Sequence, residues 1–170
     1  MWKEIKPEEC GENVFSLIGK ERMQVAAGDE TKANAMTASW GGLGVMWGKN
    51  VAYIVIRPQR YTKEFIDNGE RFSLNILPEE YRSALNYMGQ VSGRDADKMK
   101  ESGLTVQFLE HTPVFEESRM VLVCRKMYAQ VMEEESFLQQ ETVERWYPQK
   151  DYHTMYIAEI EKIYAASKEA

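Results

Sequence analysis

The sequence predicts a mainly β protein whose strands form a closed barrel or a sandwich. Short apolar runs alternate with turn residues along the first two thirds of the chain, as strands and turns do. Only short helices fit between these runs, and the absence of a strand–helix–strand rhythm disfavours a doubly wound nucleotide fold. The 170 residues are 44% apolar and 28% charged, so we expect one domain over residues 1–170 with a substantial core.

Strands are predicted wherever an apolar run is bounded by turn residues. The run Val51–Ile56 is continuous, which is typical of a strand buried on both faces. Near the end of the chain, Tyr156 and Ala158 share one parity and Glu159 has the other, which indicates a strand with one wet face. The expected strands are Val14–Ile18, Met23–Ala27, Ala35–Trp40, Val51–Ile56, Phe72–Leu77, Thr105–Leu109, Arg119–Val131 and His153–Tyr164.

Helices and turns are predicted from capping residues, prolines and glycines. Thr62–Asn68 is expected to be a helix capped by Thr62 and ended by Gly69. Pro78–Met88 has a proline in its first turn and a glycine at its exit, which also predicts a helix. We further expect a short helix at Asp95–Glu101, a glycine-rich turn at Gly41, Gly42 and Gly44, and a solvated helix or excursion at Glu133–Arg145.

Charge and cysteine content exclude several classes of function. The 21 basic and 27 acidic side chains give a net charge of −6, which disfavours nucleic acid and anionic membrane surfaces as partners. No apolar run is long enough to span a bilayer and no signal peptide is visible, so we expect a cytoplasmic protein. Two His and two Cys are spread far apart along the chain, which predicts no metal site. Cys124 lies in an apolar run and is expected in the core.

One long stretch of the chain carries no carboxylate. Between Thr31 and Lys63 there is no Asp or Glu, although roughly five are expected at the average density of acidic residues. Burial in strands explains this gap about as well as a binding site does. Within the gap, Arg57–Thr62 places two guanidinium groups and a hydroxyl after a buried strand and at a helix start, and such donors hold a phosphate. Ser92, Arg94 and Lys98 offer the same donor types on another loop.

Five short motifs follow one another along the chain: NAMTASW (Asn34–Trp40), RPQRYT (Arg57–Thr62), FSLNIL (Phe72–Leu77), SGRDADK (Ser92–Lys98) and HTMYIAEI (His153–Ile160). In this order they resemble the flavin reductase-like, FMN-binding split-barrel family, and the flavoredoxin-like branch in particular. The resemblance spans about Val14 to Tyr164. It implies a six-stranded antiparallel split β-barrel, a homodimer with FMN at or near the subunit interface, and electrons supplied by NADH, NADPH or a protein donor.

The resemblance also implies roles for individual residues. Backbone amides of the Asn34–Trp40 segment would face the polar edge of the flavin ring and stabilise negative charge on it. The implied cofactor contacts are Asn34, Met36, Thr37, Ala38, Ser39 and Trp40 along the ring, Arg57, Arg60, Tyr61 and Thr62 at the phosphate and ribityl chain, Asn75 close to the cofactor, and Ser92, Arg94 and Lys98 on a loop that closes over the phosphate.

His153 matches a histidine near the reactive face of the flavin, and it is the candidate catalytic residue. A structural role explains this histidine about as well as a functional one. In a functional role it would orient the hydride donor or protonate the flavin, because the usual pKa of histidine suits proton transfer near neutral pH.

The function expected from these residues is that of an FMN-dependent oxidoreductase, in which electrons pass from NAD(P)H or a protein donor through FMN to a small acceptor. Two alternatives remain open. One is an FMN-binding electron carrier without its own small-molecule substrate. The other is a non-redox barrel that binds a different anionic ligand or serves as a scaffold.

Overall fold

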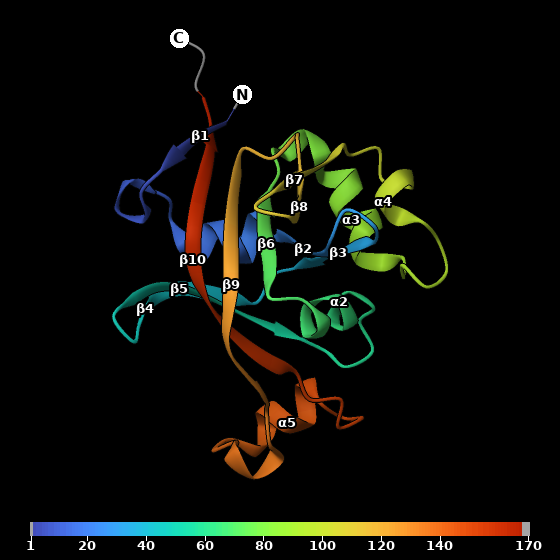
Figure 1. The fold of residues 1–170 in the computed structure, drawn as a ribbon. Coiled ribbons are helices and arrows are strands. Elements are labelled where there is room, and N and C mark those ends of the chain that lie inside the picture. The colour runs from blue at the N-terminus through green and yellow to red at the C-terminus, as the bar shows by residue number, and fades with distance from the viewer. Residues whose placement is uncertain (1, 168–170) are drawn as a thin grey trace.

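The computed structural model describes residues 2–167, and antiparallel strands dominate it (Figure 1). The main sheet follows the order β3-β2-β6-β9-β10-β5-β4, and β1 pairs with the far end of β10. In the described residues β3 and β4 are the two ends of this path and do not pair, so the sheet stays open between them. The strands are β1 (Trp2–Ile5), β2 (Met23–Gly28), β3 (Ala33–Ala38), β4 (Gly41–Met46), β5 (Lys49–Ile56), β6 (Arg71–Ile76), β9 (Met120–Val131) and β10 (Thr154–Ala166), with β7 (Val106–Leu109) and β8 (Thr112–Phe115) as a separate hairpin.

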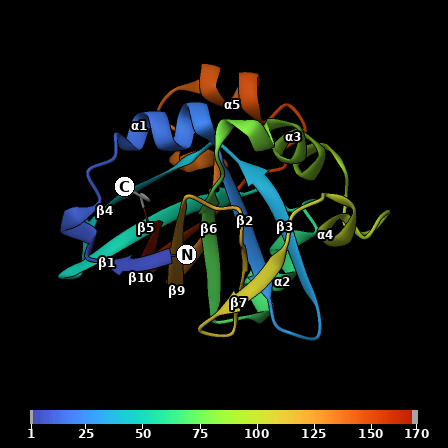
Figure 2. The same ribbon diagram turned by 90° about the horizontal axis from the view of Figure 1, so that it is seen from above.

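Short helices surround β3, the strand at one end of the sheet. Three of them, α2 (Thr62–Asn68), α3 (Arg82–Gln90) and α4 (Lys98–Glu101), contact this strand (Figure 2). Another helix, α5 (Gln140–Trp146), belongs to the excursion between β9 and β10, at the opposite end of these strands from the chain termini (Figure 1). Single helical turns lie at Pro7–Glu9, Glu79–Tyr81 and Glu134–Ser136.

Two apolar cores hold these elements together. The larger lies inside the curved sheet, where Phe72, Ile54 and Tyr156 are fully buried. The smaller lies between α3 and the outer face of β2 and β3, and includes Ala26, Leu85 and Met88. Because β3 is buried by the sheet on one face and by α3 on the other, its small residues sit between two packed layers.

The predicted mainly β class is confirmed, and most of the predicted strands are present with shifted ends. The main sheet has eight strands, whereas six were expected. Three strands were not predicted, namely β1, β4 and β8. Two of these are only four residues long, and β4 begins with the sequence GGLG, so none of the three carries the apolar pattern that marks a strand.

The segment predicted as a first strand, Val14–Ile18, is helical instead. It forms α1 (Val14–Ser16), which continues into a wider turn over Leu17–Glu21. The side chain of Asn13 accepts hydrogen bonds from the backbone amides of Phe15 and Ser16, at 3.1 and 3.2 Å. This N-cap was overlooked in the sequence, and it favours a helix over a strand.

The glycine-rich segment predicted as a turn is β4, and the true turn follows it at Trp47 and Gly48. Both turn residues have positive φ (52° and 70°), as the two-residue turns of hairpins require. The ring of Tyr53 on β5 lies directly over Gly42, where a Cβ would overlap with it. Glycine in this strand therefore makes room for a tyrosine from its neighbour.

Candidate functional site

A cavity of about 590 Å³ opens at the start of β3, and it is bordered by three of the five motifs. It lies between β3, the start of α2 and the loop that leads into α4. Its lining includes Lys32, Asn34, Tyr61, Gly93, Arg94 and Lys98. Segments that lie far apart in the sequence are thus brought to one place, and four predicted cofactor residues face the same cavity.

Asn34 and Thr62 are linked at the base of this cavity. The side-chain amide of Asn34 donates a hydrogen bond of 2.8 Å to the Thr62 hydroxyl, and both residues are buried. The Thr62 hydroxyl therefore joins α2 to β3 and does not cap the helix as predicted. Gly93 packs against the same pair: a Cβ there would overlap Asn34 and lie 2.8 Å from the Tyr61 ring. Any residue other than glycine at position 93 would therefore prevent this close approach of the loop to β3.

Two cations lie close together at this cavity, namely Lys98, which lines it, and its neighbour Arg60, and we name them the cationic cluster. The Lys98 ammonium donates to the carbonyls of Met88 and Val91, at 2.8 and 3.0 Å, at the end of α3. Burial, together with the nearby Arg60 charge, lowers the Lys98 pKa to about 8. Burial also lowers the pKa of Arg60. Within residues 2–167 neither cation forms a salt bridge.

The loop between α3 and α4 is held closed over the cavity by Arg94. Its guanidinium lies 4.8 Å from the centre of the Tyr61 ring, donates to the Gln59 carbonyl at 3.0 Å and pairs with Glu64. The Ser92 hydroxyl accepts a hydrogen bond from the Arg94 backbone amide at 3.2 Å. Ser92 and Arg94 thus shape this loop, which lies next to the cationic cluster.

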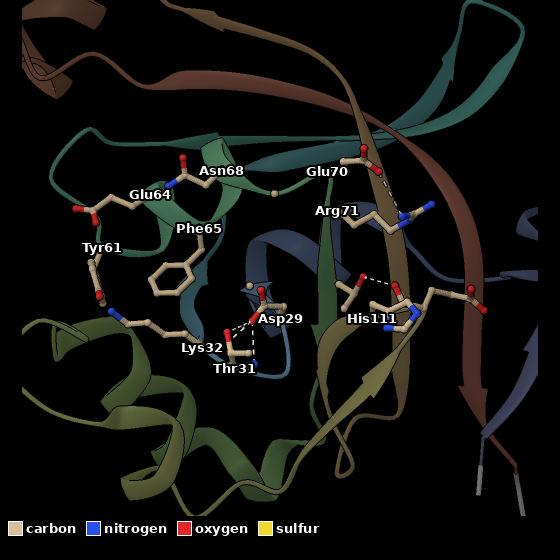
Figure 3. A pocket seen from close by; sticks show the side chains of 14 residues that line it. Asp29, Thr31, Lys32, Tyr61, Glu64, Phe65, Asn68, Glu70, Arg71 and His111 are labelled. Atoms are coloured by element: carbon tan, nitrogen blue, oxygen red, sulfur yellow. Dashed lines mark hydrogen bonds and ion pairs between the residues drawn. The ribbon is translucent and has the colours of Figure 1, made fainter.

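A second, adjoining cavity of about 450 Å³ shares Lys32 and Tyr61 with the first (Figure 3). The Lys32 ammonium lies 5.6 Å from the centre of the Tyr61 ring and 5.8 Å from that of Phe65. These side chains separate the two spaces. Acidic side chains outnumber lysine and arginine in the lining of the second cavity, whereas the lining of the first holds equal numbers of the two.

The far end of β3 borders a smaller cavity of about 230 Å³, lined by Thr37, Ala38 and Ser39 together with residues of α3. The Thr37 hydroxyl donates to the Leu85 carbonyl at 2.5 Å and accepts from Gln24 at 2.6 Å. Because this hydroxyl is already engaged, what the segment offers a ligand here is its backbone and the small side chains of Ala38 and Ser39.

His153 lies in a third place, among Trp40, Trp146 and Tyr147, and we name these four side chains the aromatic cluster. Ring centres are 4.9 Å apart between the two tryptophans and 5.1 Å apart between Trp40 and His153. Nδ1 of His153 lies 2.7 Å from the Tyr147 hydroxyl oxygen. Burial and the Arg57 charge lower the His153 pKa to about 4, so the ring is neutral at physiological pH.

Arg57 fastens the excursion that carries this cluster. Its guanidinium pairs with Asp151 at 2.7 Å and donates to the Trp146 carbonyl at 2.9 Å, while Gln59 donates to the same Asp151 carboxylate at 2.9 Å. The nearby Gln59 and Arg57 donors hold the Asp151 pKa below its usual value. Arg57 thus belongs with His153 in space, although only two residues separate it from Arg60 in the sequence.

The sequence model of the family described as Flavin reductase like domain matches residues 18–170 of this chain. The chain belongs to this family. Among curated proteins no sequence matches it.

Solved structures show the same fold in other members of the flavin reductase-like group. The chain is similar to a flavoredoxin from Methanosarcina acetivorans, with a TM-score of 0.67 and 23% identity over 88% of this chain and 70% of that one. It is also similar to an FMN-binding domain of a flavin reductases-like enzyme from Shewanella baltica OS155, with a TM-score of 0.70 and 16% identity over 97% of this chain and 77% of that one. A third similar structure, a protein with a split barrel domain from Shewanella frigidimarina NCIMB 400, has a TM-score of 0.68 and 15% identity over 96% of this chain and 76% of that one. The predicted split-barrel class and family are confirmed.

Met36 and Asn75, both singled out in this flavin reductase-like sequence, lie in the interior and line none of the three cavities. The Met36 side chain is buried in the main core. Asn75 is fully buried, donates to the Gln24 carbonyl at 3.1 Å and accepts from the Phe115 amide at 3.1 Å, so it joins β2, β6 and β8. The sequence reading missed Tyr147 and Asp151, whose closeness to His153 in ERWYPQKDYH was the available signal.

No helix among the described residues is both long and apolar enough to cross a membrane. Within the same residues no group of His, Cys, Asp or Glu side chains has the arrangement of a metal site. Cys124 is fully buried in the main core, as predicted.

Proposed function

We propose that this flavin reductase-like chain binds FMN and passes electrons through it, from NADH, NADPH or a protein donor to a small acceptor. The observation that carries the proposal is the cationic cluster. The buried Lys98 and the partly buried Arg60 lie close together without a salt-bridge partner in residues 2–167, and their mutual repulsion is relieved when an anion binds beside them. A phosphate monoester is the anionic group of FMN.

The residues around the cluster fit the rest of such a cofactor. Asn34, Thr62 and the close approach of Gly93 form a narrow base beside the cations. We assign the phosphate end to Arg60 and Lys98, under the loop held by Ser92 and Arg94, and the ring to the backbone of Thr37–Trp40. The bound flavin would supply the hydride and electron chemistry, and the protein would supply donors and exclude water.

Several structurally similar proteins support this assignment. The Shewanella baltica protein is described as FMN-binding, as is a Thermus thermophilus protein with a TM-score of 0.68 and 15% identity. We therefore propose that the flavin bound by this chain is FMN. We also propose that residues 1–170 form a single domain.

The test begins with the visible spectrum of the purified protein and with quenching of FMN fluorescence on titration. We expect binding of one FMN per chain, and a protein that neither carries nor binds FMN would contradict the proposal. Stopped-flow mixing with NADH and with NADPH then identifies the donor. Bleaching with either nucleotide is expected of a reductase, whereas bleaching only with a reduced protein identifies an electron carrier.

We also propose that the chain forms a homodimer. Large apolar side chains are exposed on β4, β5, β9 and the turn between β4 and β5, among them Met46 (41%), Trp47 (57%), Tyr53 (40%) and Tyr128 (40%). Apolar side chains gathered on one face of a sheet are typical of an interface between subunits. Light scattering during gel filtration should give twice the 19.7 kDa chain mass, and Trp47→Lys should shift it toward the monomer.

A further inference from the structure

The imidazole of His153 is anchored through only one of its nitrogens. Nδ1 lies 2.7 Å from the Tyr147 hydroxyl oxygen, and the two residues are only 7% and 4% exposed. Nε2 has no hydrogen-bond partner within residues 2–167, and it is not among the polar atoms sealed away from solvent there. One nitrogen is therefore occupied by the protein, and the other is available to a ligand.

The chemistry of the two partners sets the direction of the hydrogen bond. Burial raises the Tyr147 pKa, so the phenol keeps its proton, and the His153 pKa of about 4 keeps the imidazole neutral. A phenol O–H is a better donor than a neutral imidazole N–H. Among residues 2–167, the hydroxyl has one other side-chain acceptor, the Met132 thioether at 3.7 Å, which is a weak one. The O–H group thus donates to Nδ1, and the ring proton resides on Nε2.

We propose that Tyr147 is a positioning residue that fixes His153 as the Nε2–H tautomer, so that His153 serves its ligand as a neutral hydrogen-bond donor and not as an acid. The proposal rests on the proposed function, because the acceptor atom would belong to the flavin or to a substrate that enters beside Trp40. Of the two functional roles expected for His153, this proposal favours orientation over protonation of the flavin. The protons consumed in flavin reduction then come from water or another group.

The charged groups around His153 agree with this role. Arg57 approaches from the loop after β5 and disfavours a second positive charge, while Asp151, on the segment that precedes β10, favours it. The two are paired with each other at 2.7 Å, so their effects on the ring largely cancel. Burial dominates, and it favours the neutral form.

Nitrogen-15 NMR of the histidine side chains tests the tautomer directly in the full chain without flavin. At pH 7 we expect His153 to show a protonated Nε2 and an unprotonated Nδ1, with no titration between pH 5.5 and 8. His111, which is exposed, supplies the second set of signals and is assigned by its own substitution. A protonated Nδ1, or a doubly protonated ring at pH 7, would overturn the proposal.

Two phenylalanine substitutions separate the hydroxyl from the packing of its ring. Tyr147→Phe keeps the contacts with Phe137 and Tyr152 but removes the donor to Nδ1, so the Nε2–H signature should give way to a mixture of tautomers. Tyr152→Phe removes a hydroxyl from the neighbouring ring, whose centre is 4.9 Å away, and should leave the signature unchanged. Equal spectra for the two variants would refute the assignment to Tyr147.

Amide substitutions test the donor role in the flavin-loaded protein. His153→Gln places an N–H group near the position of Nε2, whereas His153→Asn places it near Nδ1. We expect the glutamine variant to keep flavin reduction within about threefold of wild type and the asparagine variant to lose about tenfold. Equal losses in both would exclude donation from Nε2. If the proposed function is wrong, flavin binding will be absent. The NMR experiment is carried out without flavin, so its result does not depend on that outcome.

Discussion

Arg57 and Arg60 lie in one loop and look alike in the sequence, yet their surroundings differ. Arg57 has its carboxylate, Asp151, at 2.7 Å, and a carbonyl as a second acceptor. Arg60 is partly buried, has no salt bridge within residues 2–167 and lies near a second cation. The satisfied arginine fastens the excursion between β9 and β10, whereas the unsatisfied one is the arginine that we assign to the phosphate. The presence or absence of an acidic partner distinguishes the two roles.

The largest effect expected from this comparison is that of Arg60→Met on FMN affinity. Loss of a charge-assisted contact to the phosphate should weaken binding about 100-fold, as measured by fluorescence titration. Removing the neighbouring charge should also raise the pKa of Lys98 from about 8. Lys63→Met is the matched control, since Lys63 already pairs with Asp67 at 2.7 Å and should leave affinity unchanged. Equal losses in the two variants would refute the anion site.

Gly93→Ala should open the loop beside the cationic cluster. A Cβ at this position overlaps Asn34, so the loop must move, and the free energy of unfolding should fall by about 2 kcal/mol. FMN affinity should fall with it. Gly44→Ala is the control, because no atom lies within 4 Å of a Cβ there. Urea unfolding of both variants measures the difference, and similar values would contradict the tight approach of the loop.

The burial of His153 in the aromatic cluster should make the free energy of unfolding depend on pH. The folded His153 pKa of about 4 is below its unfolded value, so the unfolded chain binds more protons between about pH 4 and 6.5. Stability should therefore fall as the pH is lowered through this window, and the contribution vanishes above it. The wild type should lose on the order of 2 kcal/mol more than His153→Gln between pH 7 and pH 4. Parallel stability curves would show that His153 titrates normally.

Arg57→Gln should have the smallest effect of the four. Without the guanidinium, Asp151 acts on the imidazole alone, so the His153 pKa should rise by about 1 unit toward its usual value. An NMR titration of the histidine side chains measures this change, and FMN affinity should stay within about threefold. A loss of affinity as large as that of Arg60→Met would remove the distinction between the two arginines.

The sequence was informative where chemistry is local. The helix Thr62–Asn68 follows from its closing Gly69, although Thr62 does not cap it, and the strand before the second motif and the core position of Cys124 follow from apolar runs. The family resemblance predicted the fold. The partners of Arg57 and His153 could not be predicted, because Tyr147 and Asp151 reach them through the excursion between β9 and β10. The strand at GGLG could not be predicted either, because it forms through pairing with β5.

The Tyr53 ring over Gly42 has a consequence for the history of this sequence. Any ancestor with a side chain at position 42 could not have held an aromatic ring at 53 in this orientation, so the two positions should have changed together. Since Tyr53 is also one of the exposed aromatic residues, a substitution at Gly42 would alter the surface that we propose as the subunit interface. Reconstructed ancestral sequences should therefore show a coupled substitution at these two sites.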